Sequence, residues 1–124
     1  MAERDAARIS RIIVVRPVAL ANTWRQRAIG LMGRSSVGKR DALFFPRCRS
    51  IHTCFMRVPM DAVFVDRTMR VVRVMSEVRP FRFPRPVWKA WGVLELASGM
   101  SQALGIRAGD QLRLEDQDSR LIEC

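Results

Sequence analysis

Two apolar runs decide the fold of this 124-residue chain: Met60-Asp61-Ala62-Val63-Phe64-Val65-Asp66 and Arg70-Val71-Val72-Arg73-Val74-Met75. Both runs are rich in valine, which favours β-strands, and the short polar stretch between them is typical of the turn of a β-hairpin. Because apolar residues follow one another almost without interruption, both faces of each strand carry apolar side chains. The sequence therefore predicts a hairpin that lies centrally in a sheet and is covered on both faces.

The segments around this hairpin predict more short strands and two short helices. Thr23 and Gln26 have the spacing of a capping box, so a helix is expected over residues 24–32. A second short helix is expected from Ser98 to Gly105, because serine favours the start of a helix and glycine its end. Clusters of β-branched and other apolar residues predict further strands at residues 9–21, 42–45, 92–97 and 111–115.

The chain has the size and composition of one folded domain. Its residues are 48% apolar, which supports a hydrophobic core at this length without a disulfide or a metal. Residues 1–8 are polar and are expected to fray. The sequence therefore predicts a single α+β domain over residues 1–124.

A net charge of +10 favours partners that carry negative charge: an anionic ligand, an acidic partner protein or a nucleic acid. The cations are almost all arginines, however, and they are scattered along the chain. Domains that bind nucleic acid gather their cations on one patch. We therefore do not favour nucleic acid on the basis of charge, since a bias in composition explains the charge equally well.

Residues 79–91 form a segment in which basic and aromatic residues alternate. Three prolines in it exclude a regular helix or a central strand. Such a pattern is typical of surfaces that stack nucleic-acid bases, and it also suits a membrane interface. We favour the simpler alternative, a long loop whose aromatic side chains pack on the core. The candidate binding residues of this segment are Arg79, Arg82, Arg85, Trp88, Lys89 and Trp91.

The expected location of the protein is the cytoplasm. Apolar residues 12–15 are too few for a secretory signal, and Arg16 and Pro17 interrupt them. The sequence has no apolar run of the length that a transmembrane helix requires. Three cysteines are an odd number, which is typical of a reduced chain. The alternative is an exported protein whose signal segment precedes this sequence.

Several short motifs occur in an order that resembles the small bacterial and archaeal domain-of-unknown-function family numbered one hundred and ninety-two. The motifs are Arg27-Ala28-Ile29-Gly30-Leu31-Met32-Gly33-Arg34, Leu43-Phe44-Phe45-Pro46, Pro59-Met60-Asp61-Ala62-Val63-Phe64-Val65-Asp66, Val93-Leu94-Glu95-Leu96 and Gly105-Ile106-Arg107-Ala108-Gly109-Asp110. The resemblance implies a compact, mostly antiparallel, barrel-like β-sheet with two short helices. It implies no activity, because the family has none assigned.

Residue types that carry out catalysis and metal binding gather between residues 48 and 61. Cys48, His52 and Cys54 would lie on one side of an extended strand, yet the two cysteines would be about 20 Å apart. One metal ion, with ligand bonds near ~2.3 Å, does not span that distance, so we expect no metal and no cofactor. His52 and Cys54 have the spacing for a thiol activated by an imidazole that Asp61 orients. The alternative is that these residues are ordinary members of a strand and a core.

Asp61 and Glu95 are acidic residues inside otherwise apolar strands. A buried carboxylate needs a partner. The structural interpretation is an ion pair, with Arg57, Arg73 or Arg107, or a bond to the backbone. The functional interpretation is two acids that transfer protons in one cleft. We favour the structural interpretation.

These observations predict a non-enzymatic binding or accessory module as the leading function, with an anionic ligand or a partner protein as its partner. The first alternative is a hydrolase or transferase that uses His52, Cys54 and Asp61. The second is a nucleic-acid-binding protein that uses the basic and aromatic segment at 79–91. The first alternative requires its three side chains to converge in one cleft, and the second requires affinity that falls steeply with salt.

Overall fold

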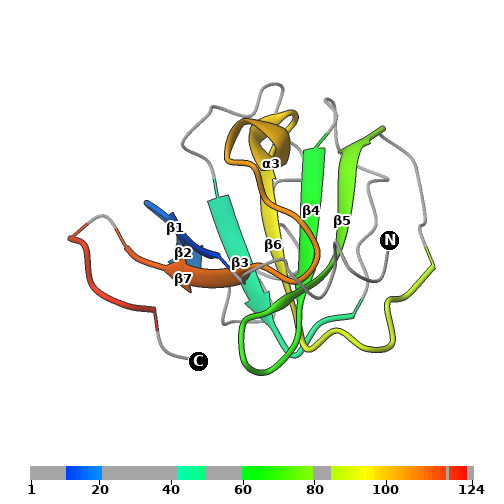
Figure 1. Cartoon of the computed structure of the whole chain (residues 1–124), viewed down its shortest axis with the longest axis horizontal. Helices are drawn as coiled ribbons and strands as arrows, with labels where there is room; N and C mark the ends of the chain where they lie inside the picture. Colours follow the sequence, from blue (N-terminus) through cyan, green and yellow to red (C-terminus); the bar gives the residue numbers. More distant parts are fainter. Residues whose placement is uncertain (1–10, 21–41, 50–59, 80–84, 117, 123–124) are drawn as a thin grey trace.

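The computed structural model describes residues 11–20, 42–49, 60–79, 85–116 and 118–122, which form short strands and one short helix (Figure 1). In chain order these elements are β1 (Ile12–Val15), β2 (Ala19–Leu20), β3 (Ala42–Pro46), β4 (Met60–Val65), β5 (Val71–Val78), β6 (Gly92–Ala97), α3 (Met100–Ala103) and β7 (Gln111–Leu114). The strands predicted near residues 42–45, 92–97 and 111–115 are thereby confirmed.

The strands form two sheets. The larger has five strands in the order β2-β3-β6-β4-β5, and its pairs are antiparallel except for β2 with β3. The smaller pairs β1 with β7 in parallel, and it lies beside β3 on one side of the molecule (Figure 1). In the described part of the chain β2 and β5 are both edge strands and do not pair, so the expected barrel-like closure is wrong. A barrel needs the two edge strands of its sheet to join, and β1 and β7 form a separate pair instead of closing the large sheet.

The predicted hairpin of β4 and β5 is confirmed. Its turn is held by Asp66, whose Oδ1 accepts hydrogen bonds from Thr68 N at 2.9 Å, Thr68 Oγ1 at 2.6 Å and Arg70 N at 3.1 Å. Partial burial raises the pKa of Asp66, but these hydrogen bonds and the charge of Arg70 together outweigh it and hold the pKa below the ordinary 3.8. The turn is therefore stabilised by an ionised aspartate.

The two strands of the hairpin differ in their surroundings. All six residues of β4 are buried, because β5 and β6 flank the strand and both of its faces are covered. In β5 only Val71 is fully buried, and the strand forms an edge of the sheet. The expectation that the whole hairpin is central is thus confirmed for β4 and wrong for β5. Its continuous valines could not distinguish a central strand from an edge strand.

Side chains from the two faces of the large sheet build two hydrophobic clusters. The first cluster lies between this sheet, the β1–β7 pair and the segment around Ile106, and it includes Val63, Leu96 and Leu112. The second lies on the opposite face and contains Met60, Ala62, Phe64, Ala90 and Val93. Alternation along β4 explains the division, since successive side chains of a strand point to opposite faces.

The strand expected at residues 9–21 is divided. Its two parts, β1 and β2, join different sheets and are separated by the cis peptide Arg16–Pro17 and by Val18. The expected helix at residues 24–32 lies outside the described residues, and within these residues the structure has one helix, α3. In α3 the N-cap is Gly99, with φ of 86°, and not the expected Ser98. The described helix is not long enough to cross a membrane.

Gly92 allows the close approach of β6 to β3. A Cβ at this position would lie 2.6 Å from Cζ of Phe44 and 3.1 Å from the carbonyl oxygen of Phe45. Phe44 is fully buried and its ring packs on Trp91, with the ring centroids 6.2 Å apart. The ring therefore has little room to move away from an added methyl group.

We predict that Gly92→Ala lowers the free energy of unfolding by about 1–3 kcal/mol, because it overpacks this contact. Urea unfolding followed by tryptophan fluorescence measures the change. In the background of Phe44→Leu, which removes the ring, the same substitution should cost less. An equal cost in both backgrounds would contradict the assigned contact, and Ser98→Ala, at an exposed site, serves as the neutral control.

Candidate functional site

Asp61 is a fully buried acidic residue on β4. Its Oδ1 accepts hydrogen bonds from Glu77 N at 2.8 Å and Gly99 N at 3.2 Å. Its Oδ2 accepts hydrogen bonds from Ser101 N at 2.8 Å and Ser101 Oγ at 2.6 Å. Four donors thus surround one carboxylate, which joins β4 to β5 and to the start of α3.

Irregular backbone on both sides of Asp61 supplies these donors. In the β4–β5 pair, Met60 lies opposite Val78 and Ala62 opposite Met75, so the register shifts at Asp61. The extra residues form a β-bulge in β5, and Glu77 has a φ of 54° within it. This conformation aims the N–H of Glu77 at the carboxylate. On the other side, the positive φ of Gly99 turns the chain from β6 into α3.

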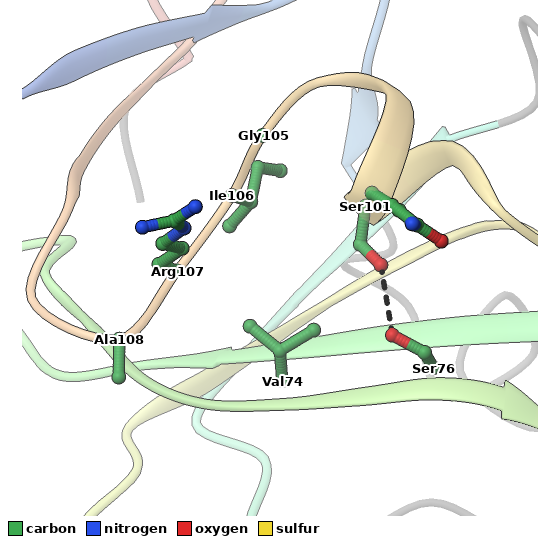
Figure 2. A pocket seen from close by; sticks show the side chains of 8 residues that line it. Val74, Ser76, Ser101, Gly105, Ile106, Arg107 and Ala108 are labelled. Carbon is green, nitrogen blue, oxygen red and sulfur yellow. Dashed lines mark hydrogen bonds between the residues drawn. The ribbon is translucent and has the colours of Figure 1, made fainter.

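Ser101 extends the network from Asp61 towards the surface. The side chain of Ser101 is 1% exposed, and its Oγ lies 3.2 Å from Oγ of Ser76 on β5. Ser76 is exposed, so a chain of hydroxyl groups leads from the buried carboxylate to solvent. Figure 2 shows the two hydroxyl groups facing each other across the gap between α3 and β5.

An open depression of about 500 Å³ lies above these hydroxyl groups. Figure 2 shows Ser76 and Ser101 at one end, Arg107 at the other, and Val74 and Ile106 between them. Its lining comes from β5, α3 and the following turn: Val74, Ser76, Ser101, Gln102, Gly105, Ile106, Arg107 and Ala108. The depression therefore combines an apolar middle with polar ends of different chemistry.

The turn that carries Arg107 is fixed by a second buried acid. Asp110 is fully buried, and its Oδ2 accepts hydrogen bonds from the backbone N–H of Arg107 at 2.9 Å and from Nη2 of Arg11 at 3.0 Å. Arg11 also donates to the carbonyl oxygen of Gly105 at 2.5 Å. The backbone of this rim is thus held in place, while the guanidinium of Arg107 is exposed.

The two acids that the sequence singles out lie on opposite faces of the sheet. Asp61 is paired with Leu96, and Ala62 with Glu95. Directly opposed residues of an antiparallel pair share a face, and neighbours along a strand alternate. Asp61 therefore points to the first cluster and Glu95, which is 8% exposed, to the second. The interpretation of these acids as a pair in one cleft is wrong.

An arginine partner for Asp61 is also wrong for the part of the chain that the structure describes. The four donors to Asp61 are three backbone amides, of Glu77, Gly99 and Ser101, and the hydroxyl group of Ser101. The bond to the backbone that we considered beside the ion pair is the arrangement found. Arg73 and Arg107 are both exposed, and Arg57 lies outside the described residues.

Other candidates from the sequence cannot be placed together. His52, Cys54 and Arg82 lie outside the described residues. Cys48 packs against the second cluster. In the described ranges we find no group of three or more histidine, cysteine, aspartate or glutamate side chains that could hold a metal ion.

Two tryptophans of the basic and aromatic segment have different environments. Trp91 packs against the first cluster and on the ring of Phe44. Trp88, in contrast, is 74% exposed, and Arg85 and Lys89 beside it are exposed as well. Arg79, at the start of the segment, is also exposed. The expectation that the loop buries its aromatics thus holds for Trp91 and is wrong for Trp88.

Sequence reasoning missed Ser76 and Ser101 as site residues, and considered Arg107 only as a partner for an acid. The sequence nevertheless contained an indication of the role of Ser101. An isolated aspartate in an apolar strand requires donors, and the Ser98-Gly99-Met100-Ser101 stretch offers amides and hydroxyl groups at a tight turn. The bulge at Glu77 left no comparable signal, because it depends on how β5 pairs with β4.

The comparisons with known proteins agree with this fold. Residues 7–114 match the model of the family DUF192, described as uncharacterised ACR. The chain belongs to this family. It is 30% identical to the UPF0127 protein of Thermococcus sibiricus over 83% of this chain and 69% of that protein. The UPF0127 protein of Pyrococcus horikoshii is 31% identical to it over 77% of this chain and 85% of that protein.

Two solved structures share the fold. A protein of unknown function from Novosphingobium aromaticivorans is 27% identical, with a TM-score of 0.64 over 76% of this chain and 71% of its own. A putative transcription regulator from Sinorhizobium meliloti is 24% identical, with a TM-score of 0.65 over 76% of this chain and 78% of its own. The second likeness shows the fold alone. Membership of the DUF192 family explains the order of motifs but supplies no activity.

We predict that Asp61→Asn lowers the free energy of unfolding by about 3 kcal/mol, because the new amide group cannot accept the hydrogen bonds that one carboxylate oxygen receives. Urea unfolding at neutral pH measures this loss.

Asp66→Asn is the matched control. All three hydrogen bonds to Asp66 go to Oδ1, which an asparagine retains, so this variant should lose no more than about 1 kcal/mol. Equal losses in the two variants would contradict the role given to Asp61.

Proposed function

We propose that this member of the DUF192 family is a non-enzymatic binding module whose ligand site is the depression between β5, α3 and the turn at residues 104–108. The observation that carries the proposal is the construction of the floor. A fully buried carboxylate fixes Ser101 through two hydrogen bonds, and Ser101 in turn contacts Ser76 at the surface. Side chains held in this way are suited to recognition, because little order is lost when a ligand binds.

The use of Asp61 supports binding rather than proton transfer. Each carboxylate oxygen already accepts two hydrogen bonds. Three of these four bonds come from backbone amides, which can only donate. A general base needs a lone pair that faces the proton it removes. The depression has instead the mixed lining of a small-molecule site, with an apolar middle and a few polar groups at its ends.

The enzyme alternative requires His52 and Cys54 to converge with Asp61. His52 and Cys54 lie outside the described residues, so this alternative stays a prediction. The donors around Asp61 argue against its part in orienting an imidazole, because Glu77, Gly99 and Ser101 occupy the carboxylate.

The nucleic-acid alternative gains one supporting observation. Trp88 is 74% exposed, and the exposed Arg85 and Lys89 flank it in the sequence, which suits a surface that combines an aromatic face with cations. Trp91 supports this alternative less, since it packs on Phe44. We therefore keep nucleic acid as the second candidate function, with Trp88 as its central residue.

Blocking the depression should abolish ligand binding without unfolding the protein. Ala108 is exposed and lines the depression, so Ala108→Trp places an indole ring over it. Ala103 is exposed on α3 and does not line the depression, which makes Ala103→Trp the matched control. We predict that a mixed set of small carboxylates, amines and amino acids shifts the amide signals of Ser101 and Arg107 in NMR spectra of the wild type and of Ala103→Trp, but not of Ala108→Trp.

Shifts that persist in Ala108→Trp, or that occur only far from the depression, would contradict the proposed site.

For the nucleic-acid candidate, we predict that Trp88→Ala weakens binding of single-stranded DNA by about tenfold, the loss expected for one stacked base. Fluorescence anisotropy at increasing salt measures both the affinity and its steep fall with ionic strength. Trp88→Phe, which keeps an aromatic face, should retain most of the affinity. If the wild type binds no DNA at low salt, this candidate function is wrong.

A further inference from the structure

The hydrogen-bond chain at the floor of the depression has a direction. The Oγ of Ser101 donates to Oδ2 of Asp61 at 2.6 Å. A serine hydroxyl group has one hydrogen and two lone pairs. The hydrogen of Ser101 is therefore used, and towards Ser76 it can only accept. The bond of 3.2 Å between the two hydroxyl groups thus requires Ser76 to be the donor.

The direction of this chain decides which hydrogen-bonding groups Ser76 presents to the depression. Its hydrogen points inward to Ser101, so its Oγ presents lone pairs alone to the depression. The negative charge of Asp61 strengthens this polarity, because hydrogen bonds in a chain polarise one another. A ligand atom that bonds to Ser76 without breaking the bond to Ser101 must be a hydrogen-bond donor.

The other end of the depression has the opposite character. Arg107 lines it, and its guanidinium is exposed and makes no ion pair with any residue in the described ranges. Arginine binds carboxylate and phosphate groups through paired N–H donors. Between the two ends, the side chains of Val74 and Ile106 provide an apolar surface (Figure 2).

We propose that the depression binds a small organic anion that carries a hydrogen-bond donor at its far end, joined to the acid by a short apolar chain. The acid group contacts Arg107, the donor contacts Oγ of Ser76, and the chain lies on Val74 and Ile106. This inference rests on the proposed function and specifies its ligand class. Amino acids with a terminal amine and hydroxy acids have this pattern, whereas dicarboxylates do not.

The experiment compares matched probes with the wild-type protein. The probes are straight-chain ω-amino carboxylates, the dicarboxylates and alkanoates of equal length, and the corresponding alkylamines. Titrations followed by the NMR amide signals of Ser101 and Arg107 give the dissociation constants. The ω-amino carboxylates should bind about tenfold more tightly than the dicarboxylates, because a carboxylate at Ser76 has no hydrogen to donate.

Two variants test which end of the depression contacts the donor of the ligand and which contacts its acid group. Ser76→Ala removes the acceptor at an exposed position and should weaken the ω-amino carboxylate about tenfold while leaving the alkanoate unchanged. Arg107→Gln should weaken both acids and leave the alkylamine unchanged. Arg113→Gln, at an exposed position of β7 that does not line the depression, controls for the loss of one positive charge.

The possible results distinguish an error in the ligand class from an error in the location of the binding site. If dicarboxylates or alkanoates bind in the depression as tightly as the ω-amino carboxylates, the ligand class is wrong and the binding site stands. The same conclusion follows if Ser76→Ala weakens all probes alike. If no probe shifts the signals of the depression at any concentration, the ligand class is wrong and the proposed site loses its support.

Discussion

The buried carboxylate of Asp61 is the interaction on which the described structure depends most. Hydrogen bonds to a charged group contribute about 1.5–3 kcal/mol each, and an unpaired carboxylate in a core is strongly unfavourable. Four donors from β5, from the turn after β6 and from α3 converge on it. The bulge in β5 and the left-handed turn at Gly99 both place backbone N–H groups where they donate hydrogen bonds to the carboxylate of Asp61. The same geometry creates the depression, since Ser76 and Ser101 lie where β5 and α3 are drawn together.

Much of the strand pattern was predictable, because it depends on local sequence. The β4–β5 hairpin and β6 occur where valine and leucine cluster between turn residues, and the Gly105 turn ends the short helix as expected. The pairing of strands was not predictable from periodicity. Residues 71–75 read like a central strand, yet β5 is an edge, because nothing in its own residues specifies which partners it finds. The barrel expectation came instead from the family resemblance, and it is wrong because β2 and β5 do not pair in the described part of the chain.

The candidate site illustrates the same limit. Asp61 and Glu95 both interrupt apolar strands, so the sequence alone offered no reason to assign them to different faces of the sheet. Register makes them different, since a shift of one position moves a side chain to the opposite face of a sheet. Ser76 and Ser101 are separated along the chain and meet only because Asp61 fixes both of their elements. The resemblance to the DUF192 family implied the mostly antiparallel β fold, but the polarity of the hydroxyl chain follows only from atomic positions.

The parallel pair of β1 and β7 has a consequence for the order in which the protein can form. These strands are the first and last described elements, and their inward side chains, such as Val15 and Leu112, complete the first cluster. As the chain emerges from the ribosome, β1 lacks its partner in the small sheet until β7 has been synthesised. The first cluster therefore stays incomplete until Leu112 and Leu114 of β7 have been added. A chain truncated before residue 111 would leave this cluster incomplete and its apolar side chains accessible to chaperones and proteases.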